Sequence, residues 1–362
     1  MKPQSAAASA AVSRRYMELP RYLRVVTGQA ELAETLTAVA RDLGFANLCV
    51  VSGAGATAGV AEGLASGLAQ LAVSHVQATG DGRDVAESLA AADELRDADV
   101  VVAVGGGKTI DVTKLACELA DVPVVTVPTQ LTADGIASPI SVVRDSAGHT
   151  QSMRARMPIA VLADLDVIAA SPVASMRAGL GDLVANPCAI RDWRLAANAD
   201  RESVDDFAAL LAQTATDLVY ATGVAQLGAE QPDRDFLRRL LEGLVLSGLA
   251  MEIAGSSRPC SGSEHLFSHA LDRLRPGTAA HGEQVAFGSL LAARLHGADW
   301  RSLQSFLRSA GMERAASGFG LSENELIEVL EVAPSTRPDR YTVLDEVDEP
   351  ELGAAVRDVL TA

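Results

Sequence analysis

Short runs of β-branched residues alternate with Ala- and Leu-rich stretches from about residue 20 to 165, and this alternation constrains the fold most. Such alternation is typical of βαβ units whose parallel sheet is buried on both faces. The expected strands are 24–27, 47–52, 72–76, 99–104 and 123–127, with helices over 32–43, 59–71 and 85–95. Two more strands, 140–143 and 159–163, are expected to pair with each other around a polar turn.

The strand signal ends after Asp166, and apolar residues then recur at helical spacing. The expected helices are 172–195, 203–229, 233–254, 261–274, 282–297 and 300–311, and a turn-rich acidic segment from about Pro334 precedes a final short helix. The predicted fold class is therefore an α/β N-terminal nucleotide-binding domain followed by an all-α C-terminal domain. The predicted boundaries are a loose tail over 1–20, the α/β domain over 21–166 and the helical domain over 167–362.

Charge and composition exclude some classes of partner. The 30 basic residues against 47 acidic ones give a net charge of −17, which argues against nucleic acid or an anionic membrane surface as the main partner. No window approaches the roughly 18 to 20 apolar residues of a membrane span, and the N-terminus lacks the apolar stretch of a signal peptide. Four widely spaced cysteines without a C-x-x-C pair indicate separate buried thiols, so a cytoplasmic location is expected.

Two glycine-rich turns follow predicted strands. The strand over 99–104 leads into the sequence GGGKTID at 105–111, and the strand over 47–52 leads into SGAG at 52–55. Glycines let the backbone approach a phosphate, and a helix start offers free amides, although a single turn of this kind is often only a tight turn. Two such turns on one sheet edge favour a dinucleotide site. No acidic residue ends the 47–52 strand, so NADP stays open beside NAD.

Three of the six histidines fall between positions 265 and 281. His265 and His269 are four residues apart, hence on one helix face, and His281 follows a Pro-Gly turn. Such a cluster binds a divalent metal, or else consists of ordinary hydrogen-bonded histidines. A catalytic metal with three protein ligands would need a carboxylate, and Asp182, in the sequence GLGDL at 179–183, is the candidate, although alone it reads as a helix N-cap.

These motifs together resemble the sn-glycerol-1-phosphate dehydrogenases, from about residue 22 to 300. That family belongs to a superfamily with glycerol dehydrogenase, the iron-containing alcohol dehydrogenases and 3-dehydroquinate synthase. The resemblance rests on the glycine loop at 105–111, DGIASP at 134–139, GDL at 181–183, SGSEHLFSHA at 261–270 and HGEQ at 281–284. The histidine segment is highly specific, whereas the glycine loop is shared across the superfamily.

The resemblance assigns roles to individual residues. It implies that the ligands of a catalytic zinc are Asp182, His265 and His281. It implies that His269 contacts substrate or relays a proton and that Asp134 holds a substrate hydroxyl near the nicotinamide. The residues that it places around the NAD or NADP cofactor are Gly105, Gly106, Gly107, Lys108, Asp111, Thr126 and Thr129.

The implied reaction is the metal-dependent interconversion of a small ketone and its alcohol, with dihydroxyacetone phosphate and sn-glycerol 1-phosphate as the first pair. One departure matters, because Ala133 stands where the family usually has a histidine, which leaves a related polyol or another phosphorylated ketone open. A substrate phosphate needs cationic partners, and Arg258, Arg191 and Arg194 lie near the metal motifs in sequence, although such arginines are more often solvated.

Two other functions compete with this interpretation. A sugar-phosphate cyclase of the 3-dehydroquinate synthase type would use NAD within one turnover, but the histidine segment resembles the dehydrogenase branch. A non-catalytic scaffold would be expected to lose part of the ligand set, which is present. One carboxylate and two imidazoles suit zinc, while iron, nickel and manganese stay open, as does a homo-oligomer.

Overall fold

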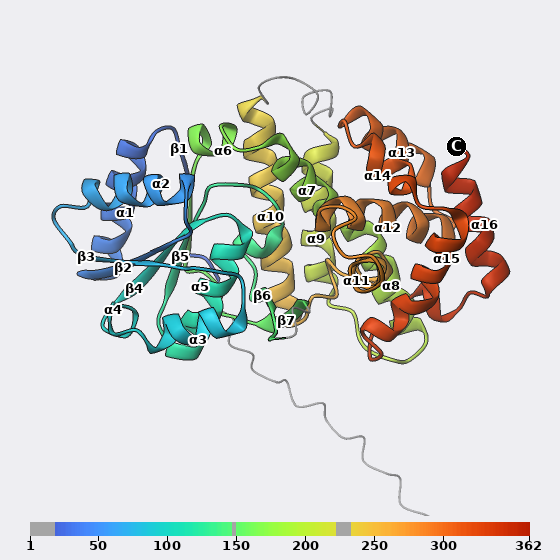
Figure 1. Cartoon of the computed structure of the whole chain (residues 1–362), viewed down its shortest axis with the longest axis horizontal. Coiled ribbons are helices and arrows are strands. Elements are labelled where there is room, and N and C mark those ends of the chain that lie inside the picture. Colours follow the sequence, from blue (N-terminus) through green and yellow to red (C-terminus); the bar gives the residue numbers. More distant parts are fainter. Residues whose placement is uncertain (1–18, 147–149, 222–232) are drawn as a thin grey trace, which may run out of the picture.

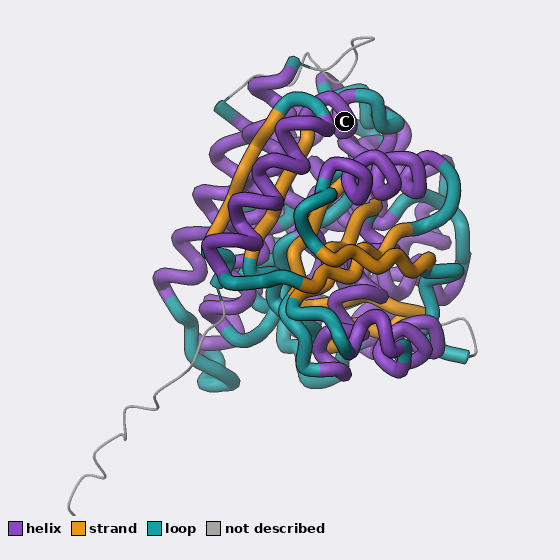
Figure 2. The backbone as a smooth tube through the Cα atoms, turned by 90° about the vertical axis from the view of Figure 1, so that its left-hand side faces the viewer, coloured by secondary structure: helices purple, strands orange, loops and turns teal. Residues whose placement is uncertain are grey.

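A six-stranded parallel sheet forms the N-terminal half of the computed structural model, which describes residues 19–146, 150–221 and 233–362. All but the last two residues of the expected tail over 1–20 therefore lie outside the described residues. The strand order is β1-β8-β5-β4-β2-β3. The strands of this sheet lie in the left half of Figure 1, and Figure 2 shows them in orange among the purple helices, seen from that side. The strands are β1 (Tyr22–Val26), β2 (Asn47–Ser52), β3 (Ala72–Gln77), β4 (Val100–Gly105), β5 (Val124–Pro128) and β8 (Ala160–Asp164).

Helices cover both faces of the sheet, as the alternating pattern predicts. The valines of β4 divide between two apolar clusters, since successive side chains point to opposite faces. Val100, Val102 and Val104 pack with α1 (Gln29–Leu43) and α2 (Ala56–Gly67). Val101 and Ala103 pack with the opposite layer. That layer contains α3 (Arg83–Ala91), the short α4 (Asp93–Arg96) and α5 (Gly107–Ala120).

The expected pairing of 140–143 with 159–163 is wrong. β6 (Ile140–Arg144) instead forms an antiparallel hairpin with β7 (Thr150–Arg154), and β8 lies between β1 and β5 in the main sheet. Every residue of β8 is buried, which is what a strand with helices on both faces requires. The sequence TQSMR of β7 is polar and mostly exposed, so it carries no apolar alternation by which to predict a strand.

Helices make up the rest of the chain. They are α6 (Leu165–Ala169), α7 (Val173–Leu183), α8 (Asn186–Asn198), α9 (Asp206–Tyr220), α10 (Arg234–Ala254), α11 (Ser263–Leu274), α12 (His281–Leu295), α13 (Trp300–Ser309), α14 (Glu313–Ala316), α15 (Glu323–Val332) and α16 (Glu349–Leu360). Short turns of 3-10 helix in the described residues are η1 (Asp134–Ile136), η3 (Gly318–Gly320), η4 (Ala333–Thr336) and η5 (Val343–Asp345).

Several expected helices differ from the observed ones. The helix expected over 85–95 is divided into α3 and α4, because Ala92 has an extended backbone. The single helix expected over 172–195 is two helices, because Pro187 in the first turn of α8 lacks an amide hydrogen and cannot continue α7. The helix expected over 203–229 ends at Tyr220, and 222–232 lies outside the described residues. The helix α15 was not expected, although its N-cap Ser322 and Glu325 form a capping box.

The helix α10 lies between the sheet on one side and the helices α11 to α16 on the other (Figure 1). It packs on η1 and α6 from the sheet side and on α7 and α9 from the helical side. A Cβ at Gly248 would meet the Ala137 carbonyl oxygen at 2.1 Å, so the helix backbone touches the η1 loop. The largest apolar cluster runs from Cys49 in the sheet to Val359 in α16. The domain boundary at residue 166 stays a prediction.

Two further sequence expectations can be compared with the structure. All four cysteines are free and buried, which confirms separate thiols. Within the part of the chain that the structure describes, none of the helices has the length and apolar character needed to span a membrane.

Candidate metal and nucleotide site

Three side chains from three helices come together to form a potential metal site. One ligand atom from each of Asp182, His265 and His281 lies within 4.8 Å of the other two. Asp182 Oδ1 is 3.3 Å from Nε2 of His265 and 4.0 Å from Nε2 of His281. A carboxylate and two imidazoles are the donors of a three-ligand catalytic metal site with one open position. The residues present therefore fit a divalent cation.

The far nitrogen of each histidine ring has its own partner. Nδ1 of His265 is 3.0 Å from Oε1 of Glu264, and Nδ1 of His281 is 2.9 Å from Oγ of Ser268. Partners of this kind fix the orientation of ligand rings in metal sites. Both rings consequently direct Nε2 toward Asp182. Glu264 and Ser268 belong to the site, although the sequence alone offered only their place inside the histidine motif.

Two glycines explain why the ligands meet. A Cβ at Gly181 would meet the Gly282 carbonyl oxygen at 2.0 Å, and one at Gly282 would meet the Ala178 carbonyl oxygen at 1.8 Å. The backbones of α7 and α12 therefore touch, which brings Asp182 beside His281. Asp182 lies in the last turn of α7, so the N-cap interpretation is wrong. The flanking glycines permit a helix crossing and do not start a helix.

Asp134 and His269 lie at the edge of this cluster. The backbone amide of Asp134 donates to Oδ2 of Asp182 over 2.9 Å. Burial, followed by the negative charge of Asp182, raises the pKa of the Asp134 carboxyl well above its usual range. The His269 ring stacks on His281 at 6.4 Å between ring centres. Burial, followed by the positive charge of Arg337, holds the pKa of His269 well below its usual value, so the ring is neutral at pH 7.

Both glycine turns lie where the strand order reverses. From β2 the chain moves outward to β3, and from β4 it moves to β5 on the other side, so the switch point lies between β2 and β4. Ligands of open α/β sheets bind at the carboxyl edge of such a point. A Cβ at Gly53 would meet Oγ1 of Thr109 at 2.8 Å, which shows that the two turns touch. The first turn of α5 has no side-chain cap, and its amides are suited to a phosphate.

The residues expected around the cofactor differ in where the structure places them. Gly105, Gly106 and Gly107 form the turn into α5. Thr129 follows β5, and its buried hydroxyl has no hydrogen-bond partner among the described residues, which fits a cofactor-facing group. Lys108 is exposed and paired with Asp81 at 2.9 Å.

Thr126 and Asp111 have partners within the protein. The Thr126 hydroxyl donates to the Ile136 carbonyl oxygen over 2.8 Å, so it holds the η1 loop. Asp111 is 3.7 Å from Nζ of Lys114, and burial raises the pKa of its carboxyl to about 6. The contacts of both residues indicate that they shape the loop that carries Asp134.

Lys114 is a residue of the site that sequence analysis missed. It is fully buried, and its ammonium donates to the carbonyl oxygens of Gly135 at 2.6 Å, Ser138 at 2.8 Å and Ile140 at 2.6 Å. These three contacts fix the 135–140 loop beside Asp134. A lysine on an otherwise apolar helix face, three residues after Asp111, was the available signal.

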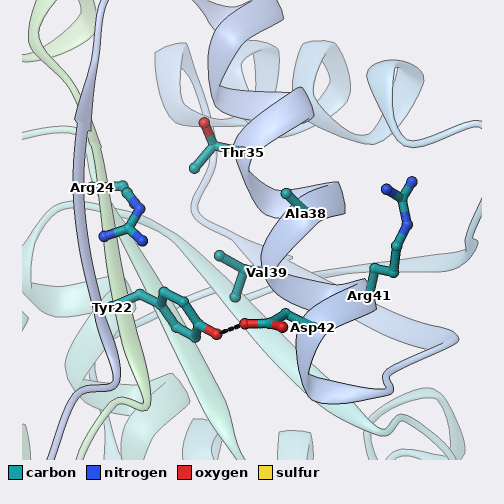
Figure 3. A pocket seen from close by; sticks show the side chains of 7 residues that line it. All are labelled: Tyr22, Arg24, Thr35, Ala38, Val39, Arg41 and Asp42. Carbon is teal, nitrogen blue, oxygen red and sulfur yellow. Dashed lines mark hydrogen bonds between the residues drawn. The ribbon is translucent and has the colours of Figure 1, made fainter.

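A cavity of about 580 Å³ lies away from this cluster, between β1 and α1 (Figure 3). Its lining includes Tyr22, whose hydroxyl donates to Asp42, together with Arg24 and Arg41. It contains no histidine and neither glycine turn. The convergence of titratable groups, and not cavity size, therefore identifies the functional site.

Comparison with known proteins agrees with this geometry. Residues 28–172 match the family described as iron-containing alcohol dehydrogenase. The chain is 37% identical over 340 residues to the glycerol-1-phosphate dehydrogenase [NAD(P)+] of Methanosarcina mazei, covering 92% of each chain. It is 44% identical over 249 residues to that of Hyperthermus butylicus, covering 68% of this chain and 70% of the other.

The fold has a solved counterpart as well. The probable glycerol dehydrogenase of Sinorhizobium meliloti superposes with a TM-score of 0.76 at 22% identity, covering 96% of this chain and 99% of the other. That likeness confirms the predicted fold class of an α/β half followed by a helical half. The extent and identity of the sequence matches show that the chain belongs to the glycerol-1-phosphate dehydrogenase family.

Proposed function

We propose that this chain is a metal-dependent NAD(P)-linked oxidoreductase that interconverts dihydroxyacetone phosphate and sn-glycerol 1-phosphate. The observation that carries the proposal is the meeting of Asp182, His265 and His281 around one point. The touching glycine turns at the switch point support a dinucleotide in the same molecule. The relatives of Methanosarcina mazei and Hyperthermus butylicus, both named glycerol-1-phosphate dehydrogenase [NAD(P)+], support the substrate pair and either cofactor.

The protein side of the chemistry follows from the geometry. A bound cation would polarise the substrate carbonyl as a Lewis acid, and the nicotinamide would supply or accept the hydride. Asp182, His265 and His281 would hold the cation. Glu264 and Ser268 keep the imidazoles turned toward it. Zinc suits this donor set, and iron, nickel and manganese also bind imidazole and carboxylate.

Proton transfer and hydrogen bonding to the substrate are assigned to His269 and Asp134, which lie beside the proposed metal ligands. His269 is neutral at pH 7 and accepts a proton from the substrate hydroxyl during oxidation, returning it during reduction. The raised pKa of Asp134 favours its protonated form, which donates a hydrogen bond to a substrate oxygen. Lys114 holds the backbone on which Asp134 is placed.

The test is oxidation of NADH and of NADPH at 340 nm by the metal-loaded protein with dihydroxyacetone phosphate. We expect activity in the wild type and a loss of at least 1,000-fold in His265→Ala, because metal and Lewis acid are lost together. His296→Ala is the matched control. Like that of His265, the side chain of His296 is mostly buried and contacts an aspartate, Asp192, at 2.8 Å, but it does not belong to the group of possible metal ligands. Its zinc content and activity should persist.

Inactivity of the metal-loaded wild type with both cofactors would contradict the substrate assignment. Release of free phosphate from a sugar phosphate would instead indicate the cyclase reaction.

A further inference from the structure

A cluster of three arginines borders a second cavity. The cavity measures about 330 Å³, and its lining residues are Glu202, Ser256, Arg258, Arg337, Asp339 and Arg340. Arg258 belongs to the loop between α10 and α11, whereas Arg337 and Arg340 lie between η4 and η5. Of the arginines that the sequence suggested for a phosphate, Arg191 and Arg194 are exposed and do not line this cavity.

Arg337 and Arg340 point at the same hydroxyl. Oγ of Ser257 accepts from Nη1 of Arg337 over 3.3 Å and from Nη2 of Arg340 over 3.0 Å. Two guanidinium groups are thus held close together by one neutral side chain. Among the residues that the structure describes, neither forms an ion pair with a carboxylate, and this includes the neighbouring Asp339. Arg258 differs, because its guanidinium is paired with Glu202.

Neither the Arg337 nor the Arg340 guanidinium has a carboxylate in ion-pair contact among the described residues, although the negative charges of Glu264 and Glu202 act on Arg340 through space. Burial, followed by the positive charges of Arg337 and Arg258, lowers the pKa of Arg340. Guanidinium groups bind phosphate through paired, charge-assisted hydrogen bonds, and a phosphate monoester carries nearly two negative charges. A dianion matches the cluster in charge, and each Nη atom of the two guanidinium groups carries a second N–H beside the one already donated.

The cluster adjoins the metal site. Nη1 of Arg340 donates to the carbonyl oxygen of Ser261, four residues before His265. The turn η4, directly before Arg337, packs on α11, which carries His265 and His269. Nη2 of Arg337 donates to Oγ of Ser152 on β7 over 2.7 Å, so this guanidinium also touches the sheet half. An anion here would lie at the junction of both halves, beside the substrate position.

We propose that Arg337 and Arg340 bind the phosphate group of the substrate, with Arg258 and its partner Glu202 forming a neutral wall of the same pocket. The inference rests on the proposed function for the identity of the substrate. It goes further in naming the residues by which a phosphorylated ketone is distinguished from an unphosphorylated one.

The test compares two substrates in matched variants. Metal-loaded wild type, Arg337→Gln, Arg340→Gln and Arg337→Lys are assayed with dihydroxyacetone phosphate and with dihydroxyacetone, and inorganic phosphate binding is titrated by calorimetry. Arg357→Gln is the control, because Arg357 forms a surface ion pair with Glu323. We expect each Gln variant to raise KM for dihydroxyacetone phosphate on the order of 10- to 100-fold, since a charge-assisted contact is lost.

Several readouts isolate this role. The KM for NADH should stay unchanged in the Gln variants, and phosphate binding should be lost. The KM for dihydroxyacetone should change far less than the KM for dihydroxyacetone phosphate, although kcat with both substrates follows the pKa of His269, on which both arginine charges act. Arg337→Lys should recover part of the phosphate affinity. An unchanged KM for dihydroxyacetone phosphate with intact phosphate binding would overturn the inference while leaving the proposed function standing. An equal rise in KM for both substrates would also overturn it, because that indicates a structural role.

Failure of the proposed function gives a different result. A wild type that does not reduce dihydroxyacetone phosphate, yet binds inorganic phosphate in a manner that Arg337→Gln abolishes, would sink the proposed substrate pair. The arginines would then stand as the phosphate site for another phosphorylated substrate.

Discussion

At the scale of single residues, His265 lies between two carboxylates. Burial alone would lower its pKa, but hydrogen bonds to Asp182 and Glu264 outweigh burial and raise the pKa to about 9 in the metal-free protein. The positive imidazolium thus neutralises a site that otherwise gathers negative charge. A metal ion takes over this function when it binds, because ligand nitrogens must be unprotonated.

The raised pKa predicts how the stability of the metal-free protein depends on pH. The contribution of His265 is fully present below its unfolded pKa of about 6.5 and is lost as pH rises through about 9. The free energy of unfolding should fall on the order of 3 kcal/mol across this window. Urea unfolding between pH 6 and pH 10 measures the effect.

The variant His265→Gln is the control for this loss. It should have a flatter pH profile in the metal-free state, and metal-loaded wild type should lack the loss as well. An identical slope in wild type and His265→Gln would show that another group is responsible.

At the scale of elements, the contact between α7 and α12 places two of the three proposed metal ligands, Asp182 and His281. The contact is made by backbone atoms. If either Gly181 or Gly282 carried a Cβ, that atom would lie only about 2 Å from a carbonyl oxygen of the other helix. No side chain can enter there without separating the helices. Asp182 directly follows Gly181, and His281 directly precedes Gly282. Any separation of the two helices therefore moves both side chains of the proposed metal site.

The variant Gly282→Ala should therefore lose both stability and metal affinity. Overpacking of this kind costs about 1–3 kcal/mol, and zinc affinity should fall at least tenfold because Asp182 and His281 move apart. Gly59→Ala is the matched control, as Gly59 is helical with open space around its Cβ position. That variant should be neutral or stabilising by about 0.5–1 kcal/mol.

Urea unfolding and a zinc titration against a chelator give the two quantities. Equal zinc affinity in Gly282→Ala and the wild type would disprove the link between the helix contact and the site.

At the scale of the whole molecule, the sheet half and the helical half share one apolar cluster. Leu131 and Ile136 from the loop after β5 lie in the same cluster as Leu244 of α10 and Phe287 of α12. Lys114 and Arg337 add polar links, since the first holds the η1 loop under α10 and the second reaches β7. Neither half can open without exposing buried surface of the other.

This continuity predicts one cooperative unfolding transition. Both tryptophans, Trp193 and Trp300, lie in the helical half, so their fluorescence reports on it. Thiol reactivity of Cys49 and Cys117, in a variant with Cys188 and Cys260 replaced by alanine, reports on the sheet half. The two midpoints in urea should coincide. Midpoints separated by more than the error of the fit would show two independent domains.

The sequence by itself predicted the α/β half followed by a helical half, both glycine turns and, through the family resemblance, the grouping of Asp182, His265 and His281 that the structure brings together. The fold class and the turns depend on local patterns, namely short apolar runs of β-branched residues followed by glycines, whereas the ligand set is what the resemblance of the histidine segment implies. It also indicated the family, because the histidine segment is specific. The sequence did not predict the position of β8 in the main sheet or the pairing of β6 with β7. Which strands pair depends on which of their faces become buried in the folded protein.

Only the tertiary structure decided how distant residues meet. Lys114 and the carbonyl oxygens it binds, the backbone contact between Gly181 and Gly282, and the approach of Arg337 and Arg340 to α11 all join segments far apart in sequence. A buried charge or a missing Cβ has no periodic signature, because its partner is set by packing. The residues that hold the site in place are therefore visible only once the chain has folded.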